Sequence, residues 1–148
     1  RRIEAGLMTQ AEFDISTTPF DAGLGHFVSI GKTAFIGKVA LEKADRRSRT
    51  FGMRVRQGIA QRGRNISING DIVGLVCSST WSPYQKCGVA LVRMDNPEIG
   101  PGTEANVIGV DGNTYSAQLC KLPMYDVKGD IVRGINIEIP EEAKAWSG

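Results

Sequence analysis

The feature that most constrains this chain is an alternation of apolar and polar residues that begins at Thr50. Glycine or arginine separates the apolar residues, which are Phe51, Met53 and Val55. A period of two places successive side chains on opposite faces of an extended backbone. The pattern therefore predicts a strand with one buried face.

Turn signals divide the residues that follow into further short strands. Asn69-Gly70 and Asp111-Gly112 each lie between apolar runs, and both pairs favour tight hairpin turns. Short strands joined by turns predict a small closed barrel or sandwich for roughly residues 48–125, so we expect a mainly β fold. The side chains expected to point inward are Phe51, Met53, Val55, Val73, Leu75, Val89, Leu91, Val107 and Leu119.

Patterns outside this region predict other elements. Residues 23–30 have the character of one strand, and the INIEI run at 135–139 alternates as a strand does. Residues 33–49 show apolar residues at helical spacing, with Thr33 as the expected N-cap and basic residues at the C-terminal end. Residues 78–83 are interpreted as a polar hairpin turn.

Composition excludes several classes of function. The chain has 148 residues, enough for one domain with a core, and its net charge of +2 is too small to indicate binding to nucleic acid or membrane. Three cysteines and one histidine lack the spacing of a metal site, so we expect half-buried reduced thiols in a cytoplasmic-type protein. The chain opens on RRIEAG without a methionine, and we expect a fragment of a longer protein.

A few residues stand out without forming a catalytic constellation. Taken alone, Glu4 has the character of a solvated surface acid and Arg62 that of a solvated turn residue. Trp81, among hydroxyl residues, is more typical of a hairpin packing anchor than of a ligand platform. Asp21 and the pair Tyr125-Asp126 each come two residues after a proline. We expect no catalytic residue and no metal ligand within this chain.

Six segments, in order, resemble the C-terminal half of the aminomethyltransferase family, which comprises the T-protein of the glycine cleavage system and its relatives. The resemblance extends over residues 2 to about 125. The segments are RRIEAGL, STTPFDAGLGHFV, TAFIGKVAL, NGDIVGLVCSSTWSPYQKCGVALV, GPGTEANV and CKLPMY.

The resemblance implies a fold, a cofactor and a reaction. Family members bind tetrahydrofolate in a central channel and transfer to it a one-carbon unit from a small amine or methylated donor. Residues 1–30 would be the C-terminal edge of an α+β folate-binding domain, and residues 31–49 a connecting helix. Residues 50–130 would form the β-barrel and 131–148 a C-terminal tail. The N-terminal folate-binding portion would be missing.

Site residues follow from the resemblance position by position. Glu4 occupies the glutamate position of the family's E-A-G motif, which faces the folate, and a carboxylate can accept two parallel N–H bonds from a pterin edge. Asp21 occupies a position where the family has glutamate, so its side chain is one methylene shorter than the family's. Arg62 matches a basic residue that would meet the folate's glutamate tail. Trp81 stands where the family has an aromatic residue.

Departures from the family pattern leave alternatives open. His26 stands where the family often has tryptophan, and LMTQAEF lacks a family tyrosine. The tail after Pro123 is more similar to relatives that act on methylated amines or sulfonium compounds, such as dimethylsulfoniopropionate demethylase. Other readings are a non-catalytic barrel that docks a lipoyl carrier protein, a domain of a fused amine dehydrogenase, and a folate binder that transfers nothing.

Overall fold

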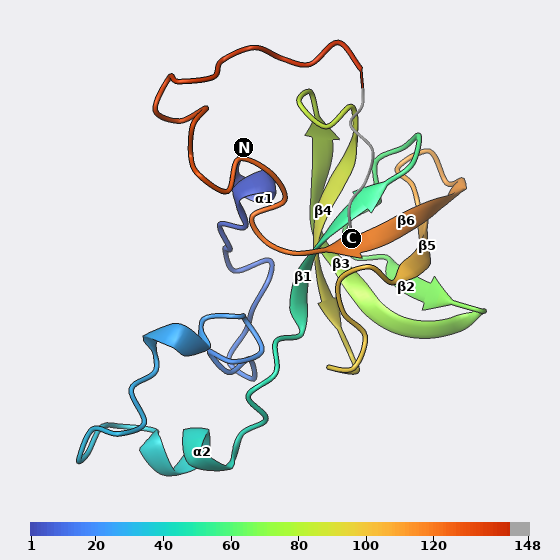
Figure 1. Cartoon of the computed structure of the whole chain (residues 1–148). Helices are drawn as coiled ribbons and strands as arrows, with labels where there is room; N and C mark the ends of the chain where they lie inside the picture. Colours follow the sequence, from blue (N-terminus) through green and yellow to red (C-terminus); the bar gives the residue numbers. More distant parts are fainter. Residues whose placement is uncertain (143–148) are drawn as a thin grey trace.

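The computed structural model describes residues 1–142, and its main body is a closed β-barrel (Figure 1). All neighbouring strands are antiparallel, in the order β1-β4-β3-β2-β5-β6 around the barrel. The mainly β fold class and the barrel are therefore confirmed. The strands are β1 (Thr50–Val55), β2 (Asn65–Ile68), β3 (Asp71–Ser82), β4 (Cys87–Met94), β5 (Glu104–Ile108) and β6 (Thr114–Cys120).

Both predicted tight turns are present. Asn69 and Gly70 join β2 to β3 with φ angles of 53° and 94°, and a hairpin turn with two positive φ angles is the one that asparagine-glycine favours. Between β5 and β6, Gly109 N donates to Asn113 O at 2.8 Å, and Gly112 has a φ of 84°. Local turn chemistry thus fixes two of the barrel's hairpins.

The barrel interior is filled by buried apolar side chains from all six strands. Met53, Val55, Val107 and Leu119 are almost completely buried there, as predicted. The complete set of buried members is Met53, Val55, Ala60, Ile66, Val76, Ala90, Val92, Met94, Ala105, Val107, Ala117 and Leu119, with Phe51 and Val73 among the partly buried residues packed against them.

Leu75 is 36% exposed, so its predicted inward position is wrong. The register of β3 shifts against β2 on one side and, between Val76 and Ser78, against β4 on the other. The shift against β2 precedes Leu75, because Ser67 pairs with Ile72 and Ile66 with Gly74, and the extra residue Val73 moves the following side chains to the other face. Val76 therefore points into the core where strict alternation predicted Leu75.

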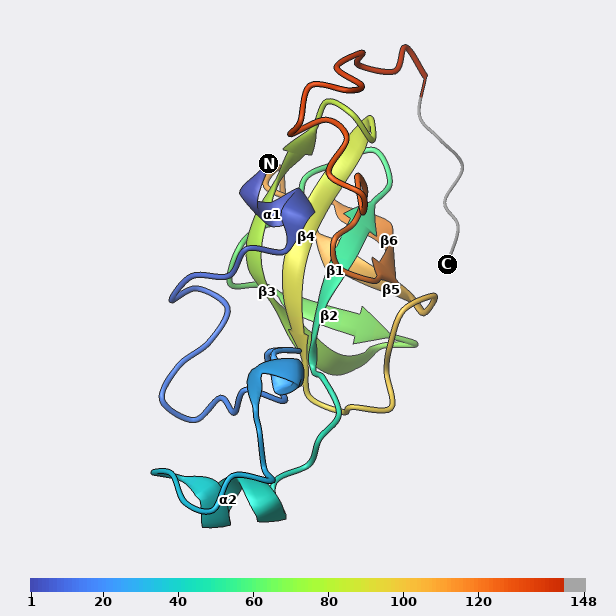
Figure 2. The ribbon, with the colours of Figure 1, turned by 60° about the vertical axis from the view of Figure 1, so that its left-hand side comes forward.

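A second apolar cluster lies outside the barrel wall, under the short helix α1 (Arg2–Ala5). Val89 and Leu91 are buried in this cluster and not inside the barrel, which corrects their predicted position. Figure 2 shows α1 lying against β3 and β4. The members are Ile3, Cys87, Val89, Leu91, Cys120 and Met124. Strand β4 is consequently buried on both faces.

Residues 6–49 form turns and two short helical elements. The strand predicted at 23–30 is wrong, because the 3-10 helix η1 (Gly25–Phe27) occupies this region. The helix predicted from Thr33 is limited to α2 (Lys38–Lys43), which begins after Gly37 at a φ of 87°. A positive φ cannot continue a right-handed helix, so the helix begins only after Gly37, which takes the N-cap position predicted for Thr33.

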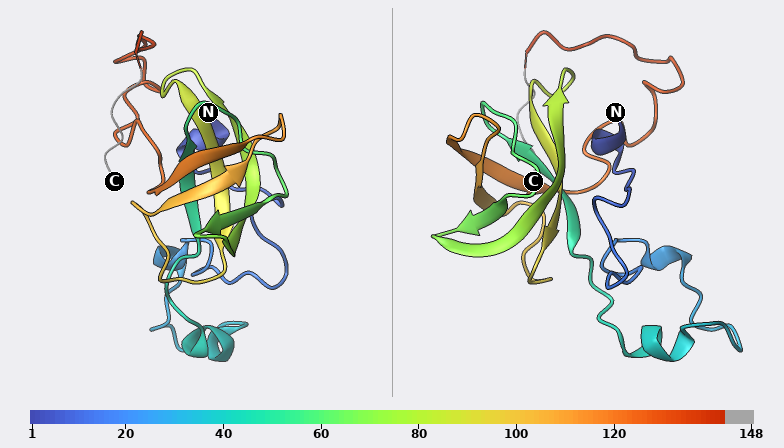
Figure 3. Two further views of the ribbon diagram at one scale, coloured as in Figure 1. Left: turned by 90° about the vertical axis from the view of Figure 1, so that its right-hand side faces the viewer. Right: turned by 180° about the vertical axis from the view of Figure 1, so that it is seen from behind.

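The residues after β6 leave the barrel and pass beside α1 (Figure 3). No strand forms at 135–139, where Ile135, Ile137 and Ile139 are exposed, so this prediction is wrong. A closed barrel has no free edge at which a further strand could pair. Among the described residues, no helix has the length and apolar character needed to cross a membrane.

Candidate functional site

Glu4 lies buried between α1 and the end of β3. Only 3% of its surface is exposed, so the solvated-acid interpretation does not apply. The hydroxyl of Ser82 donates a hydrogen bond to Oε1, and the Tyr125 hydroxyl lies 3.4 Å from Oε2. Oε1 is thus held firmly from inside the protein, while Oε2 has the longer contact.

A cavity of about 300 Å³ opens at this carboxylate. We call it the Glu4 pocket. One wall comes from α1 and the other from the chain after β6. Its lining residues are Arg1, Glu4, Ala5, Pro123, Tyr125, Asp126, Val127, Lys128, Gly129 and Val132. The pocket therefore combines a buried carboxylate with an aromatic ring, two cations and aliphatic side chains.

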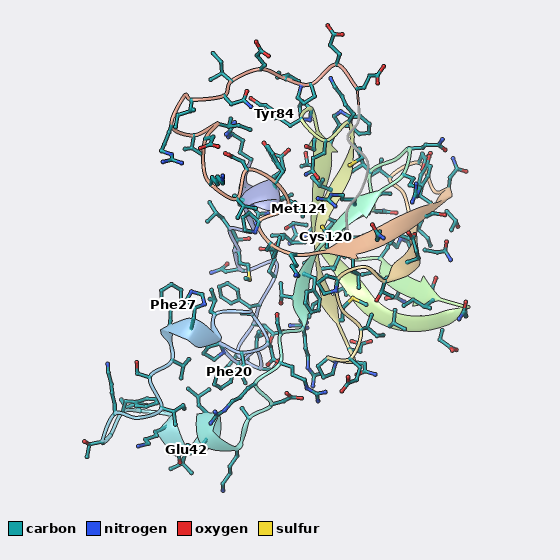
Figure 4. The ribbon with its side chains drawn as sticks, in the orientation of Figure 1. Phe20, Phe27, Glu42, Tyr84, Cys120 and Met124 are labelled. Carbon is teal, nitrogen blue, oxygen red and sulfur yellow. The ribbon has the colours of Figure 1, made fainter. Side chains whose placement is uncertain are left out.

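The tip of the β3–β4 hairpin buttresses the pocket. The rings of Tyr84 and Tyr125 stack with centroids 5.4 Å apart and planes at 26°, and the Arg1 guanidinium lies 5.7 Å from the Tyr84 ring centre. Figure 4 shows Tyr84 at this tip, on the side of the barrel where Met124 and α1 lie. Burial, followed by the nearby Glu4 charge, raises the pKa of Tyr125 to about 12. Its hydroxyl therefore stays protonated and can donate.

The hydroxyl-rich stretch beginning at Ser78 is strand and not turn. Residues 78–82 belong to β3, and the turn consists of residues 83–86. Because neighbouring strand residues face opposite sides, Ser82 points to Glu4 while Trp81 points away, with 43% of its surface exposed. Trp81 does not line the Glu4 pocket.

A second buried carboxylate, Glu12, was not predicted from the sequence. It is 1% exposed and accepts hydrogen bonds from the Ser78 hydroxyl and from Thr9 N at 2.6 Å. Arg2 bridges the pair, with Nη1 3.1 Å from Glu12 Oε2 and Nη2 2.9 Å from Ser78 Oγ. Burial alone would raise the pKa of Glu12, but these hydrogen bonds and the Arg2 charge outweigh it and lower that pKa. No local pattern marks the residue.

Asp21 forms hydrogen bonds with nearby residues at the end of β4 that lies away from the Glu4 pocket. Its Oδ2 accepts hydrogen bonds from Thr18 N at 2.9 Å and Thr18 Oγ1 at 2.7 Å. Its carbonyl oxygen accepts from the backbone nitrogens of Arg49 and Thr50, at the entry to β1. Asp21 lines a separate polar cavity of about 530 Å³, together with Arg49 and Arg93.

Arg62 is exposed in the turn before β2 and does not line the Glu4 pocket. Of the four residues predicted from the sequence, Glu4 alone lines that pocket. Asp21, Arg62 and Trp81 lie elsewhere in the chain, and their contact with a ligand stays a prediction. The sequence-based search found neither the tyrosine pair nor Ser82 as partners of Glu4.

Comparison with known proteins places the chain in one family. The sequence profile of the glycine cleavage T-protein C-terminal barrel domain matches residues 46–126. The chain is 38% identical over 133 residues to a probable aminomethyltransferase of Natronomonas pharaonis and 32% identical over 133 residues to the aminomethyltransferase of Streptomyces coelicolor. Each alignment covers 84% of this chain and 37% or 36% of the relative.

A solved structure has the same fold. The crystal structure of glycine cleavage system aminomethyltransferase T from Bartonella henselae matches with a TM-score of 0.72 and 26% sequence identity. The match covers 84% of this chain and 37% of that chain, so this chain spans little more than a third of the proteins it resembles. The chain belongs to the glycine cleavage T-protein (aminomethyltransferase) family, and it contains that family's C-terminal barrel domain.

Proposed function

We propose that this chain is the C-terminal part of a tetrahydrofolate-dependent transferase, which moves an aminomethyl or methyl group from a small donor to the folate. The observation that carries the proposal is Glu4, a buried carboxylate that lines a pocket. Each carboxylate oxygen accepts two hydrogen bonds. Oε2 can therefore accept an N–H from an amino-pyrimidine edge while Ser82 keeps Oε1 in place.

Exposed apolar side chains in the first 39 residues support a further, N-terminal folate-binding portion. They belong to segments with little regular structure, and Figure 4 shows Phe27 well away from the barrel. Exposed apolar residues that gather in one region mark surfaces that another body covers. The residues are Leu7, Phe13, Ile15, Leu24, Phe27, Ile36 and Val39.

These observations favour the domain boundaries expected from the sequence. Residues 1–30 would complete the folate-binding domain, 31–49 would connect it, and 50–130 would be the barrel domain. Residues 131–148 would be the tail, of which 143–148 lie outside the described residues. We propose a cytoplasmic location, which suits three buried free thiols.

The donor is a small one-carbon compound, with a lipoyl carrier protein as the partner that would present an aminomethyl group. In the whole enzyme, catalysis would rest on orientation of the two reactants in a closed channel. The isolated chain should bind tetrahydrofolate weakly or not at all, because most of the channel walls would be missing. Micromolar or tighter binding in calorimetry of the isolated chain would contradict this part of the proposal.

The test uses the full-length polypeptide that joins this chain to a folate-binding portion. We expect tetrahydrofolate binding and transfer from one of three donors: an aminomethyl lipoyl carrier, a methylated amine or a sulfonium compound. Transfer from the sulfonium compound would identify a dimethylsulfoniopropionate demethylase-like enzyme. Folate binding without transfer from any donor would favour a folate binder, and no folate binding would favour a docking module of a fused amine dehydrogenase.

A further inference from the structure

We propose that Arg54, in the outer wall of the barrel, is a positioning residue for the Glu4 pocket. Its guanidinium contacts both segments that fix the Glu4 carboxylate, although neither the sequence patterns nor the family motifs mark it. The inference rests on the proposed function only where it states the effect on folate affinity. The contacts themselves belong to this chain.

The first segment is the β3–β4 hairpin tip. Arg54 Nε donates to Gln85 Oε1 at 2.7 Å, and Gln85 N donates to Ser82 Oγ at 3.1 Å. The Ser82 hydroxyl has a single proton, which it donates to Glu4 Oε1. Because Ser82 Oγ already accepts from Gln85, that proton is directed at the carboxylate. Arg54 thus holds the loop that sets the direction of this hydrogen bond.

The second segment follows β6. Arg54 Nη2 donates to Met124 O at 2.7 Å, and Met124 N donates to the Glu4 carbonyl oxygen at 2.8 Å. The next residue, Tyr125, supplies the contact to Glu4 Oε2 and one wall of the pocket. One guanidinium therefore restrains both sides of the carboxylate, through Ser82 on Oε1 and through Tyr125 on Oε2.

Arginine suits this place because its planar fork presents several donors in fixed directions. Lysine would carry the same charge on one nitrogen, which cannot reproduce the spacing of Nε and Nη2. Loss of Arg54 should release the hairpin tip and the residue 124–125 segment, while the barrel core lies on the other face of β1. The expected defect is in the orientation of Glu4.

The test measures tetrahydrofolate affinity of the full-length polypeptide by calorimetry. Arg54→Met, Arg54→Lys and Gln85→Leu should each weaken binding. Arg54→Met should have the largest effect, a loss of about 10-fold in affinity relative to the unchanged protein, because a held hydrogen-bonding group loses its geometry. The matched control is Arg56→Met, because Arg56 lies farther along the same chain segment, is exposed and pairs with Glu104 at 3.6 Å. That control should change affinity by less than about 2-fold.

A double-mutant cycle separates positioning from general destabilisation. In a Glu4→Gln background, Arg54→Met should cost less than about 2-fold, because coupled residues are not additive. Additive losses, or an Arg54→Met affinity equal to that of the Arg56→Met control, would overturn the inference. If Glu4→Gln itself leaves affinity unchanged, the proposed folate contact fails, and the restraint by Arg54 is then decided by the ligand-free measurement that follows.

A ligand-free measurement covers the case in which Arg54→Met fails to fold. In the isolated chain, Gln85→Leu removes one contact of Arg54 without burying an unpaired charge. Hydrogen exchange should then quicken at the backbone amide of residue 85, which is bonded to Ser82 Oγ in the unchanged chain, and not at Gly109, whose amide bonds Asn113 on the β5–β6 hairpin. An equal protection factor for the backbone amide of residue 85 in the variant and the unchanged chain would refute the restraint.

Discussion

The Ser82 hydroxyl donates its hydrogen bond to the carboxylate of Glu4, a residue 78 positions earlier in the chain. This contact joins α1 to the end of β3, so a hydroxyl of the run at 78–82 holds a buried carboxylate. A second serine of the same strand, Ser78, bonds the other buried carboxylate, Glu12. Two serines on one face of β3 thus donate hydrogen bonds to two buried carboxylates of the N-terminal segment.

Replacing Glu4 by glutamine should impair folate binding more than folding in the full-length polypeptide. Glutamine keeps the length and one acceptor oxygen for Ser82 but loses the charge. A charge-assisted hydrogen bond contributes about 1.5–3 kcal/mol, so affinity should fall about 10- to 100-fold. Calorimetric titration and thermal melts on the same protein give the two quantities.

The control for Glu4 is Glu42→Gln, because Glu42 is exposed on α2 and lies 3.8 Å from Lys38. It should alter neither quantity. A lowered melting temperature with intact folate affinity in Glu4→Gln would assign the residue a purely structural role. Unchanged values in both measurements would remove it from the site.

Glu12→Gln should destabilise the isolated chain by about 3 kcal/mol at pH 7, because it leaves Arg2 and the Ser78 and Thr9 donors without a charged acceptor. The pKa of Glu12 is lower in the folded state than its ordinary value of 4.5. Its ionised form therefore contributes stability that is present above pH 4.5 and is lost as the pH falls through the folded-state pKa.

Urea melts of the unchanged chain and of Glu12→Gln at several pH values check this dependence. The difference in free energy of unfolding should be constant above neutral pH and should shrink below pH 4.5. A difference that stays the same at low pH would show that the charge of Glu12 is not what stabilises the fold.

Leu119→Ala should destabilise the barrel by roughly 2–5 kcal/mol, the usual cost of emptying a packed core position. Leu119 is fully buried among the interior residues. Val110→Ala is the control, since Val110 is 65% exposed in the β5–β6 connection. Chemical denaturation should separate the two variants, and equal unfolding midpoints would mean that the interior is not close-packed.

Gly88→Ala should disrupt the barrel, with a loss of about 3 kcal/mol or more. A Cβ atom on Gly88 would lie 1.9 Å from the carbonyl oxygen of Gly58, and backbone cannot swing aside as a flexible side chain can. Gly100→Ala is the matched control, because a Cβ atom there meets nothing within 4 Å. Circular dichroism melts should show a large loss for Gly88→Ala and almost none for Gly100→Ala.

Features fixed by neighbouring residues were predictable from the sequence. Asn69-Gly70 forms its turn because two positive φ angles suit those residues wherever they occur. Met53 and Val55 lie inside because an uninterrupted strand keeps its period. The barrel could therefore be predicted from local patterns and from the family resemblance.

Features fixed by distant residues could not be predicted. Leu75 is exposed because bulges depend on how β3 pairs with its neighbours, and Val89 is buried outside the barrel because α1 covers it. The Glu4 motif identified one acid of the site. Its partners Ser82 and Tyr125 come from the far end of the chain, and only the folded structure brings them together.

Burial of β4 on both faces has a consequence for how the strand finds its alignment. When one face is apolar and the other polar, a slip by one residue is penalised because it exposes the apolar side. In β4 a slip would only exchange Ala90 and Val92 for Val89 and Leu91, which are equally apolar. Hydrophobicity therefore gives this strand little protection against misalignment. The close approach of Gly88 to Gly58 protects its register instead. Any other residue of β4 brought to that point would carry a Cβ into the carbonyl oxygen, so the strand's single glycine acts as its alignment mark.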